Sequence, residues 1–170
     1  HFHGHKDRNR YSTVEVPGKG VLKPIIERDM DTVRALGIHV SPGRLPEIHR
    51  LPQEREAAQL RLGRMGLDGP LLIIGLGASR PTKFWPLERY ALLAGRWCQE
   101  KKGSAIAVMS ADEESQGEGF LRAVEKHVED PATRRRVTIE SRLGLRDLFA
   151  LIGEASILVG NDSCLLYTSP

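Results

Sequence analysis

The sequence predicts an α/β fold built on a Rossmann-like parallel sheet, because strand and helix patterns alternate between residues 70 and 160. Four short, almost wholly apolar runs have the length and composition of buried strands. Three segments between them repeat apolar residues every three or four positions, which is typical of helices that bury one face. Strands joined in this way by helices pair in parallel with right-handed crossovers, so the whole stretch predicts one parallel sheet.

Two helices are expected before this sheet. Apolar residues from Ile26 to Val33 share one face of a helix over residues 24–36, and Gly37 ends it. Residues 40–52 contain three prolines and a glycine, and we interpret them as an extended linker. The apolar face predicted for the second helix, over residues 53–65, consists of Ala57, Leu60, Leu62 and Met65.

The first 23 residues are polar and show no periodicity. His1, His3 and His5 alternate, which would suit a metal site, but no cysteine accompanies them. We therefore favour a solvated segment over a metal site here.

The sheet region divides into strands at 71–76, 104–109, 136–140 and 156–159, with helices at 87–101, 115–128 and 145–153. Each helix has one apolar face that should pack on the sheet. These faces are formed by Leu87, Tyr90, Ala91, Ala94, Trp97 and Cys98, then by Phe120, Leu121, Val124 and Val128, and last by Leu145, Leu148, Phe149 and Ile152.

The composition is that of a globular chain with a mild preference for anionic partners. The 170 residues are 40% hydrophobic and 28% charged, with a formal net charge of +3. The basic run Thr133–Arg136 could contact nucleic acid, but we favour a solvated segment before a strand. Two cysteines, one of them on a helix face, do not indicate a disulfide scaffold, and no apolar run reaches the ~18 residues of a membrane span.

Three polar loops follow strands and should meet at the carboxyl edge of the sheet, where ligands of such folds bind. They are Gly77–Pro86, Met109–Glu114 and Gly160–Ser163. In the first loop Ser79 offers a hydroxyl and Lys83 a positive charge, and Pro86 stands where a helix can begin. Together these features predict a pocket for phosphate.

Each of these residues also has a plainer interpretation. Lys83 could be an ordinary surface lysine, Asp162 a turn residue, and Glu113 and Glu114 first-turn acids of a helix. For Trp85 we favour packing between helix and sheet over a stacking platform. The loop is not a dinucleotide fingerprint, because it lacks the G-x-G-x-x-G spacing.

Two motifs carry a family resemblance. GASRPTKFWPLERY (77–90) is similar to the G-A-S-x-x-x-K-x-W-P-x-E-x-[YF] loop of glycosyltransferase family 9, the ADP-heptose:lipopolysaccharide heptosyltransferases. GNDS (160–163) is similar to the start of that family's G-N-D-S-G-P-x-H loop. The resemblance covers about residues 24–163.

The resemblance implies a two-domain GT-B glycosyltransferase with its active site between two Rossmann-like domains. Residues 1–52 would be the tail of the N-terminal acceptor domain and the linker, and 53–163 part of the C-terminal nucleotide-sugar-binding domain. It implies inverting transfer of heptose from ADP-heptose to the lipopolysaccharide inner core, with no bound metal and no cofactor. It also implies a cytoplasmic protein at the inner face of the bacterial inner membrane, with peripheral membrane contact by the full-length protein and no nucleic-acid partner.

The family's site residues can be carried over position by position. Lys83 would stabilise the departing diphosphate, the one catalytic role on this chain. Ser79 and Thr82 would bind phosphate, and Glu113 or Glu114 the ribose. Asp162 would bind hydroxyls of the donor sugar, with Ser163 and the backbone after Asp162 near the phosphate. The family's general base, an acceptor-domain aspartate, has no counterpart here.

The chain departs from the family pattern at three places. Met109-Ser110-Ala111-Asp112 replaces a loop that usually holds two glycines and a proline, and Ser141 replaces a glycine. After GNDS, the sequence continues as CLLYTSP instead of G-P-x-H, which resembles translated sequencing adapter. We therefore expect 164–170 to be a non-native tail.

Two other functions remain open at this stage. One is a GT-B transferase for a different nucleotide sugar, and the other is a non-catalytic nucleotide- or phosphate-binding module of Rossmann-like or flavodoxin-like fold. If the chain is a family 9 fragment, we expect it to be inactive alone. We also expect the apolar residues Leu71–Leu76 and Phe149 to remain exposed.

Overall fold

The computed structural model describes residues 24–41, 48–78 and 81–161. The chain forms two compact units, one up to residue 46 and one from residue 47 onward. The first contains helix α1 (Ile25–Ala35), where Arg34 pairs with Asp31 and Glu27 on the same helix. The helix ends as predicted, with Gly37 in the left-handed region at φ +80°.

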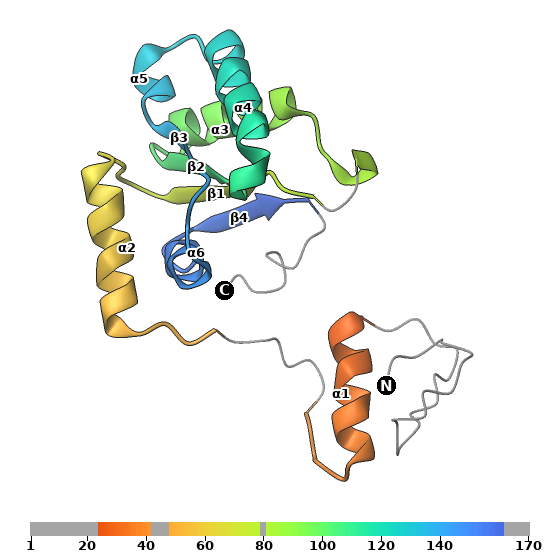
Figure 1. Cartoon of the computed structure of the whole chain (residues 1–170). Helices are drawn as coiled ribbons and strands as arrows, with labels where there is room; N and C mark the ends of the chain where they lie inside the picture. Colours follow the sequence, from red (N-terminus) through yellow and green to blue (C-terminus); the bar gives the residue numbers. More distant parts are fainter. Residues whose placement is uncertain (1–23, 42–47, 79–80, 162–170) are drawn as a thin grey trace. The chain divides into compact units, whose positions relative to one another are not determined.

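The second unit is built on a parallel sheet in the order β3-β2-β1-β4 (Figure 1). The strands are β1 (Leu71–Gly75), β2 (Ser104–Val108), β3 (Val137–Glu140) and β4 (Ile157–Gly160). Gly75 pairs in register with Val108 on one side and with Gly160 on the other, so the strands end at one common edge. The predicted Rossmann-like parallel sheet is confirmed.

Helices cover both faces of this sheet (Figure 1). Helices α3 (Leu87–Glu100) and α4 (Glu114–His127) pack on one face, and α2 (Pro52–Arg64) and α6 (Leu145–Ile152) lie on the other. Alternate residues of β1 supply the two cores, with Leu72 and Ile74 under α3 and α4, and Leu71 and Ile73 under α6.

The expected exposure of Leu71–Leu76 is wrong. These apolar side chains are at most 3% exposed, because β2 and β4 pair with both sides of β1 and helices cover both faces. The expected faces of α3 and α4 are confirmed: Tyr90, Ala94 and Cys98 are buried on α3, as are Phe120 and Val124 on α4.

Two helices show only part of the predicted face. Leu62 and the cap residue Met65 of α2 and Leu148, Phe149 and Ile152 of α6 pack on the core as expected, but one leucine of each helix does not. In α2, Leu60 is 56% exposed and Ala58 is buried instead, because the helix packs mainly against α6. In α6, Leu145 is 64% exposed, while Ala150 and Leu151 are buried. The spacing of apolar residues predicts that a helix has one buried face, but it does not show which neighbouring element will cover that face.

The basic run before β3 is not simply a solvated segment. Thr133 is buried in the unpredicted short helix α5 (Pro131–Arg134), and its N–H and hydroxyl donate to the cap residue Asp130. Arg136 donates to the carbonyls of Lys102 and Gly103 and pairs with Asp68 at 2.8 Å. Arg136 therefore joins the loops at the amino edge of the sheet.

No helix within the described ranges is long and apolar enough to cross a bilayer.

Candidate functional site

The carboxyl edge of the sheet contains a topological switch point between β1 and β4. From β1 the chain proceeds through α3 to β2 on one side, whereas β4 pairs with the other side of β1. In open parallel sheets, ligands bind outside the carboxyl ends of the strands at such a point. The loops after β1 and β4 therefore border the expected binding crevice.

The loop after β1 carries the predicted phosphate-binding residues. A single 3₁₀ turn at Pro81–Lys83 presents Thr82 to solvent and leaves Lys83 half-buried. Pro86 then caps α3, whose first turn starts at this edge, as the sequence predicted. Because the N-terminus of a helix carries a partial positive charge, it adds to the field of the Lys83 ammonium group. Ser79, also predicted here, lies outside the described residues.

The loop after β4 is tied to the loop after β1 by one side chain. Asn161, which is 5% exposed, donates from Nδ2 to the carbonyl of Leu76 at 2.9 Å. Its Oδ1 accepts from the backbone N–H of Trp85 and from the hydroxyl of Tyr90, both at 3.1 Å. The two loops therefore meet at the switch point, as expected. Asp162 and Ser163, which follow Asn161, lie outside the described residues.

The loop after β2 brings Glu113 against the loop after β1. Its carboxylate accepts hydrogen bonds from the backbone N–H and the hydroxyl of Ser110, which closes the turn. A Cβ added at Gly77 would lie only 2.7 Å from Oε2 of Glu113. Glycine at position 77 therefore allows the carboxylate to approach the backbone, in a place where we expected a ligand to approach it.

Glu114 faces the loop after β3 instead. Its Oε1 accepts from the Ser141 hydroxyl and from Nε of Arg142, both at 2.9 Å. The Arg142 guanidinium and then the Ser141 hydroxyl lower the pKa of Glu114 below its usual value, so this carboxylate is ionised near neutral pH. Ser141, noted as a departure from the family pattern, thus has a partner at this edge.

The structure therefore brings Thr82, Lys83, Glu113 and Glu114 to adjoining loops at one sheet edge. Sequence reasoning missed Asn161 and Tyr90, whose hydrogen bonds join the loop after β4 to the loop after β1 and to the first turn of α3. The sequence did contain a sign of their importance, because Asn161 directly follows the fourth strand and Tyr90 is the last residue of the first motif. In the part of the chain that the structure describes, no group of three or more His, Cys, Asp or Glu side chains is placed to hold a metal ion.

The sequence as a whole matches one family model. The model of glycosyltransferase family 9 (heptosyltransferase) matches residues 13–167, which is most of the chain. The chain belongs to glycosyltransferase family 9. The resemblance inferred from the two motifs is thereby confirmed. No curated protein sequence matches the chain significantly.

Solved structures support the fold of this family 9 chain. E. coli ADP-heptose lps heptosyltransferase II superposes with a TM-score of 0.62 at 22% identity, over 78% of this chain and 38% of that one. A family 9 glycosyl transferase from Veillonella parvula superposes with a TM-score of 0.65 at 22% identity, over 81% of this chain and 37% of that one. E. coli heptosyltransferase WaaC with ADP-2-deoxy-2-fluoro heptose superposes with a TM-score of 0.55 at 17% identity, over 89% of this chain and 42% of that one. The chain thus spans well under half the length of these structures.

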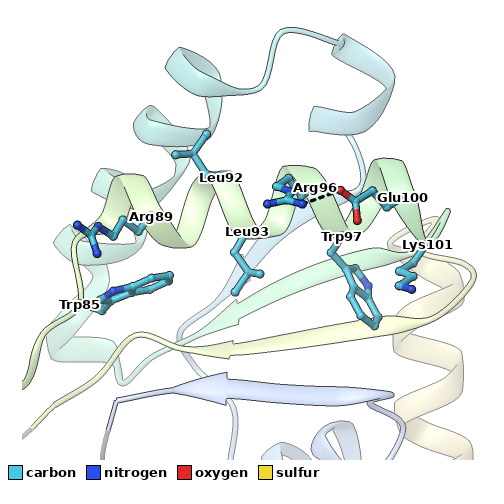
Figure 2. A pocket seen from close by; sticks show the side chains of 8 residues that line it. All are labelled: Trp85, Arg89, Leu92, Leu93, Arg96, Trp97, Glu100 and Lys101. Atoms are coloured by element: carbon cyan, nitrogen blue, oxygen red, sulfur yellow. Dashed lines mark hydrogen bonds and ion pairs between the residues drawn. The ribbon is translucent and has the colours of Figure 1, made fainter.

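A separate open groove of about 500 Å³ runs along α3 of the family 9 chain (Figure 2). Its lining comprises Trp85, Arg89, Leu92, Leu93, Arg96, Trp97, Glu100 and Lys101. Trp97 donates its ring N–H to the carbonyl of Pro70, and Arg96 pairs with Glu100. Among the described residues, none of those predicted to bind the donor lines this groove. Trp85 is also connected to the sheet edge, because its backbone N–H donates to Asn161 and its ring packs edge-on against Tyr90 with centroids 4.7 Å apart. The side chain is 37% exposed, and the packing role between helix and sheet that we favoured stays a prediction.

Proposed function

We propose that this chain is the nucleotide-sugar-binding part of an inverting glycosyltransferase that transfers heptose from ADP-heptose to the lipopolysaccharide inner core. Membership in family 9 supports glycosyl transfer. Similar structures were solved with ADP and with an ADP-heptose analogue, which supports an adenine nucleotide as the donor's leaving group. The observation that carries the proposal is the convergence of the loops after β1 and β4 on Asn161, with the Lys83 turn between its contacts.

The roles follow from the charge that develops during transfer. When an acceptor hydroxyl displaces ADP from the sugar, negative charge accumulates on the departing diphosphate. In our proposal Lys83 and the first turn of α3 offset that charge, while Ser79, Thr82 and Ser163 hydrogen-bond phosphate. Asp162 binds hydroxyl groups of the heptose. No residue of this chain is assigned as general base.

Of the two acids, we assign the ribose to Glu113. Glu113 lies against Gly77, in the loop that leads to Lys83, whereas Glu114 is paired with Arg142 on the far side of β2. A ribose attached to a diphosphate at the switch point would reach the nearer carboxylate first. Glu114 then acts indirectly by holding the loop after β3.

The acceptor and location form the finer part of the proposal. A lipopolysaccharide-core acceptor implies action at the cytoplasmic face of the inner membrane, by a full-length protein with peripheral membrane contact. We propose that no metal and no cofactor take part, since Lys83 supplies the positive charge that a divalent cation would otherwise provide.

The test is an ADP titration of the chain by calorimetry, with UDP as the alternative nucleotide. Lys83→Ala should weaken ADP binding by about 10- to 150-fold, the loss of a hydrogen bond to a charged group worth about 1.5–3 kcal/mol. Lys126→Ala, on an exposed lysine in the last turn of α4, is the matched control and should change nothing.

Adding EDTA should leave the affinity for ADP unchanged. Equal affinities of unaltered chain and Lys83→Ala would refute the phosphate role of Lys83. Preference for UDP over ADP would point to a transferase for another nucleotide sugar.

A further inference from the structure

Asn161 is a buried side chain whose full hydrogen-bonding capacity is directed at one loop. Nδ2 donates to the carbonyls of Leu76 at 2.9 Å and Gly77 at 3.4 Å. Oδ1 accepts from the N–H of Trp85 and from the Tyr90 hydroxyl. One carboxamide thus holds the start of the loop after β1 and its end, eight residues further along the chain.

The orientation of this carboxamide is determined by its partners. Two carbonyl oxygens face the NH₂ group and the Trp85 N–H faces the oxygen, so the flipped amide would lose these three contacts, while the Tyr90 hydroxyl can donate or accept. Burial raises the pKa of Tyr90, so its hydroxyl keeps its proton and remains a donor. Tyr90 is itself fixed, since its ring is 2% exposed on α3 and meets the Trp85 ring edge-on.

The held loop contains the residues of the proposed phosphate site. Thr82 and Lys83 lie in the turn between the two tethered ends. A lysine on an untethered loop would lose conformational freedom when it binds phosphate, and that loss subtracts from affinity. Tethering both ends lowers this cost before the ligand arrives.

We propose that Asn161 and Tyr90 are positioning residues that preorganise the Lys83 turn for the diphosphate of the donor. The inference rests on the proposed function, because it assumes that Lys83 meets a diphosphate. It adds a role for two side chains that do not themselves touch the ligand.

The experiment measures ADP affinity by calorimetry for the unaltered chain, Tyr90→Phe, Lys83→Ala and the double variant. Tyr90→Phe keeps the buried ring and removes only the hydroxyl, and should weaken ADP binding about 2- to 10-fold, a typical hydrogen-bond contribution. In the Lys83→Ala background the same change should have a smaller effect, since the loop then has no ammonium group to position. Asn161→Asp, which replaces the Nδ2 donor by a carboxylate oxygen facing two carbonyls and adds a negative charge, should show a larger loss.

The matched control is Ser104→Ala. Ser104 is 1% exposed and its hydroxyl bonds the backbone of Asp68 at the opposite edge of the sheet, so its loss destabilises the fold without touching the loop. ADP affinity should be unchanged in this variant. Hydrogen exchange of the segment 76–90 should accelerate in Tyr90→Phe and Asn161→Asp but not in Ser104→Ala.

The outcomes separate the inference from the proposed function. The inference is overturned if Tyr90→Phe leaves ADP affinity unchanged, or if it weakens ADP binding equally with and without Lys83. Either result leaves the proposed function intact. Absence of ADP binding to the unaltered chain overturns the function. In that case, hydrogen exchange still tests whether Asn161 and Tyr90 hold the loop. Equal exchange rates of the segment 76–90 in all variants would show that they do not.

Discussion

Cys98 shows how burial decides the chemistry of a single residue in this protein. Its thiol lies on the inner face of α3, 3% exposed, with Sγ 3.9 Å from the carbonyl oxygen of Arg136. Burial raises the pKa of Cys98 from 9.0 to about 11, against a smaller opposite effect of the Arg136 charge. Since the thiolate is the reactive form, the folded protein keeps this cysteine inert.

Thiol labelling tests the burial of Cys98. In a Cys164→Ser background, Ellman's reagent at about pH 8 should modify Cys98 at least ~100-fold more slowly in the folded chain than in urea. The unfolded state also loses its thiol proton first as pH rises, so stability should fall between pH 9.0 and about 11. Equal labelling rates with and without urea would contradict the burial of Cys98.

Ion pairs connect α2 and the segment before it to α6 and the residues that follow it. Arg146 of α6 makes two hydrogen bonds to the Glu54 carboxylate, at 2.7 and 2.6 Å, and a third to the carbonyl of His49. Arg50 donates to Glu154 at 2.8 Å and lies over Gly153, where a Cβ would displace it. These contacts make α2 part of the second unit although few of its side chains are buried.

The matching prediction is a pH-dependent loss of stability on Glu54→Gln. The Arg146 guanidinium and then the N–H of Leu51 lower the pKa of Glu54 below its ordinary 4.5. A carboxylate with a depressed pKa stabilises the fold above its ordinary pKa, and the effect disappears as pH falls through the folded value. Urea unfolding should therefore separate Glu54→Gln from the unaltered chain near pH 7, and progressively less below 4.5.

The exposed Glu56 on the same helix supplies the control for that measurement. Glu56→Gln should leave the unfolding midpoint almost unchanged at either pH, because exposed charges contribute little. A difference between Glu54→Gln and the unaltered chain that stays constant with pH would argue against the ion pair.

For the whole molecule, stability depends on two apolar layers that share one sheet. Phe120, with no exposed surface, packs with Tyr90, Leu72 and Val124 in the layer under α3 and α4. Ile73, Ile106 and Leu151 form the layer on the other face. Because β1 and β2 supply both layers, damage to one should weaken the whole unit.

Phe120→Ala should therefore destabilise the second unit by about 3–5 kcal/mol, the cost of a large cavity. Phe84→Ala, at a phenylalanine that is 36% exposed, should cost less than about 1.5 kcal/mol. Both values come from urea unfolding followed by far-ultraviolet circular dichroism. Similar losses for the two variants would mean that the layer around Phe120 is not packed as described.

Much of the fold could be predicted from the sequence. Apolar spacing indicated α3 and α4 with their buried faces, four strands at nearly their observed bounds, and a parallel sheet. Motif spacing indicated the family and placed Thr82, Lys83, Glu113 and Glu114 on loops at one edge. These predictions succeed because backbone periodicity and turn chemistry are properties of neighbouring residues.

The tertiary structure alone decided which side chains meet. Patterns along the chain were enough to indicate an α/β family 9 chain with a basic loop after its first strand. Only the packed sheet showed that Asn161 holds that loop, that Glu113 lies against Gly77, and that α2 turns Leu60 outward. The reason is physical: each of these contacts joins residues distant in sequence, or depends on which element covers a face. Local patterns state what a residue can bury or bond, but the packing of the sheet and helices selects its partner.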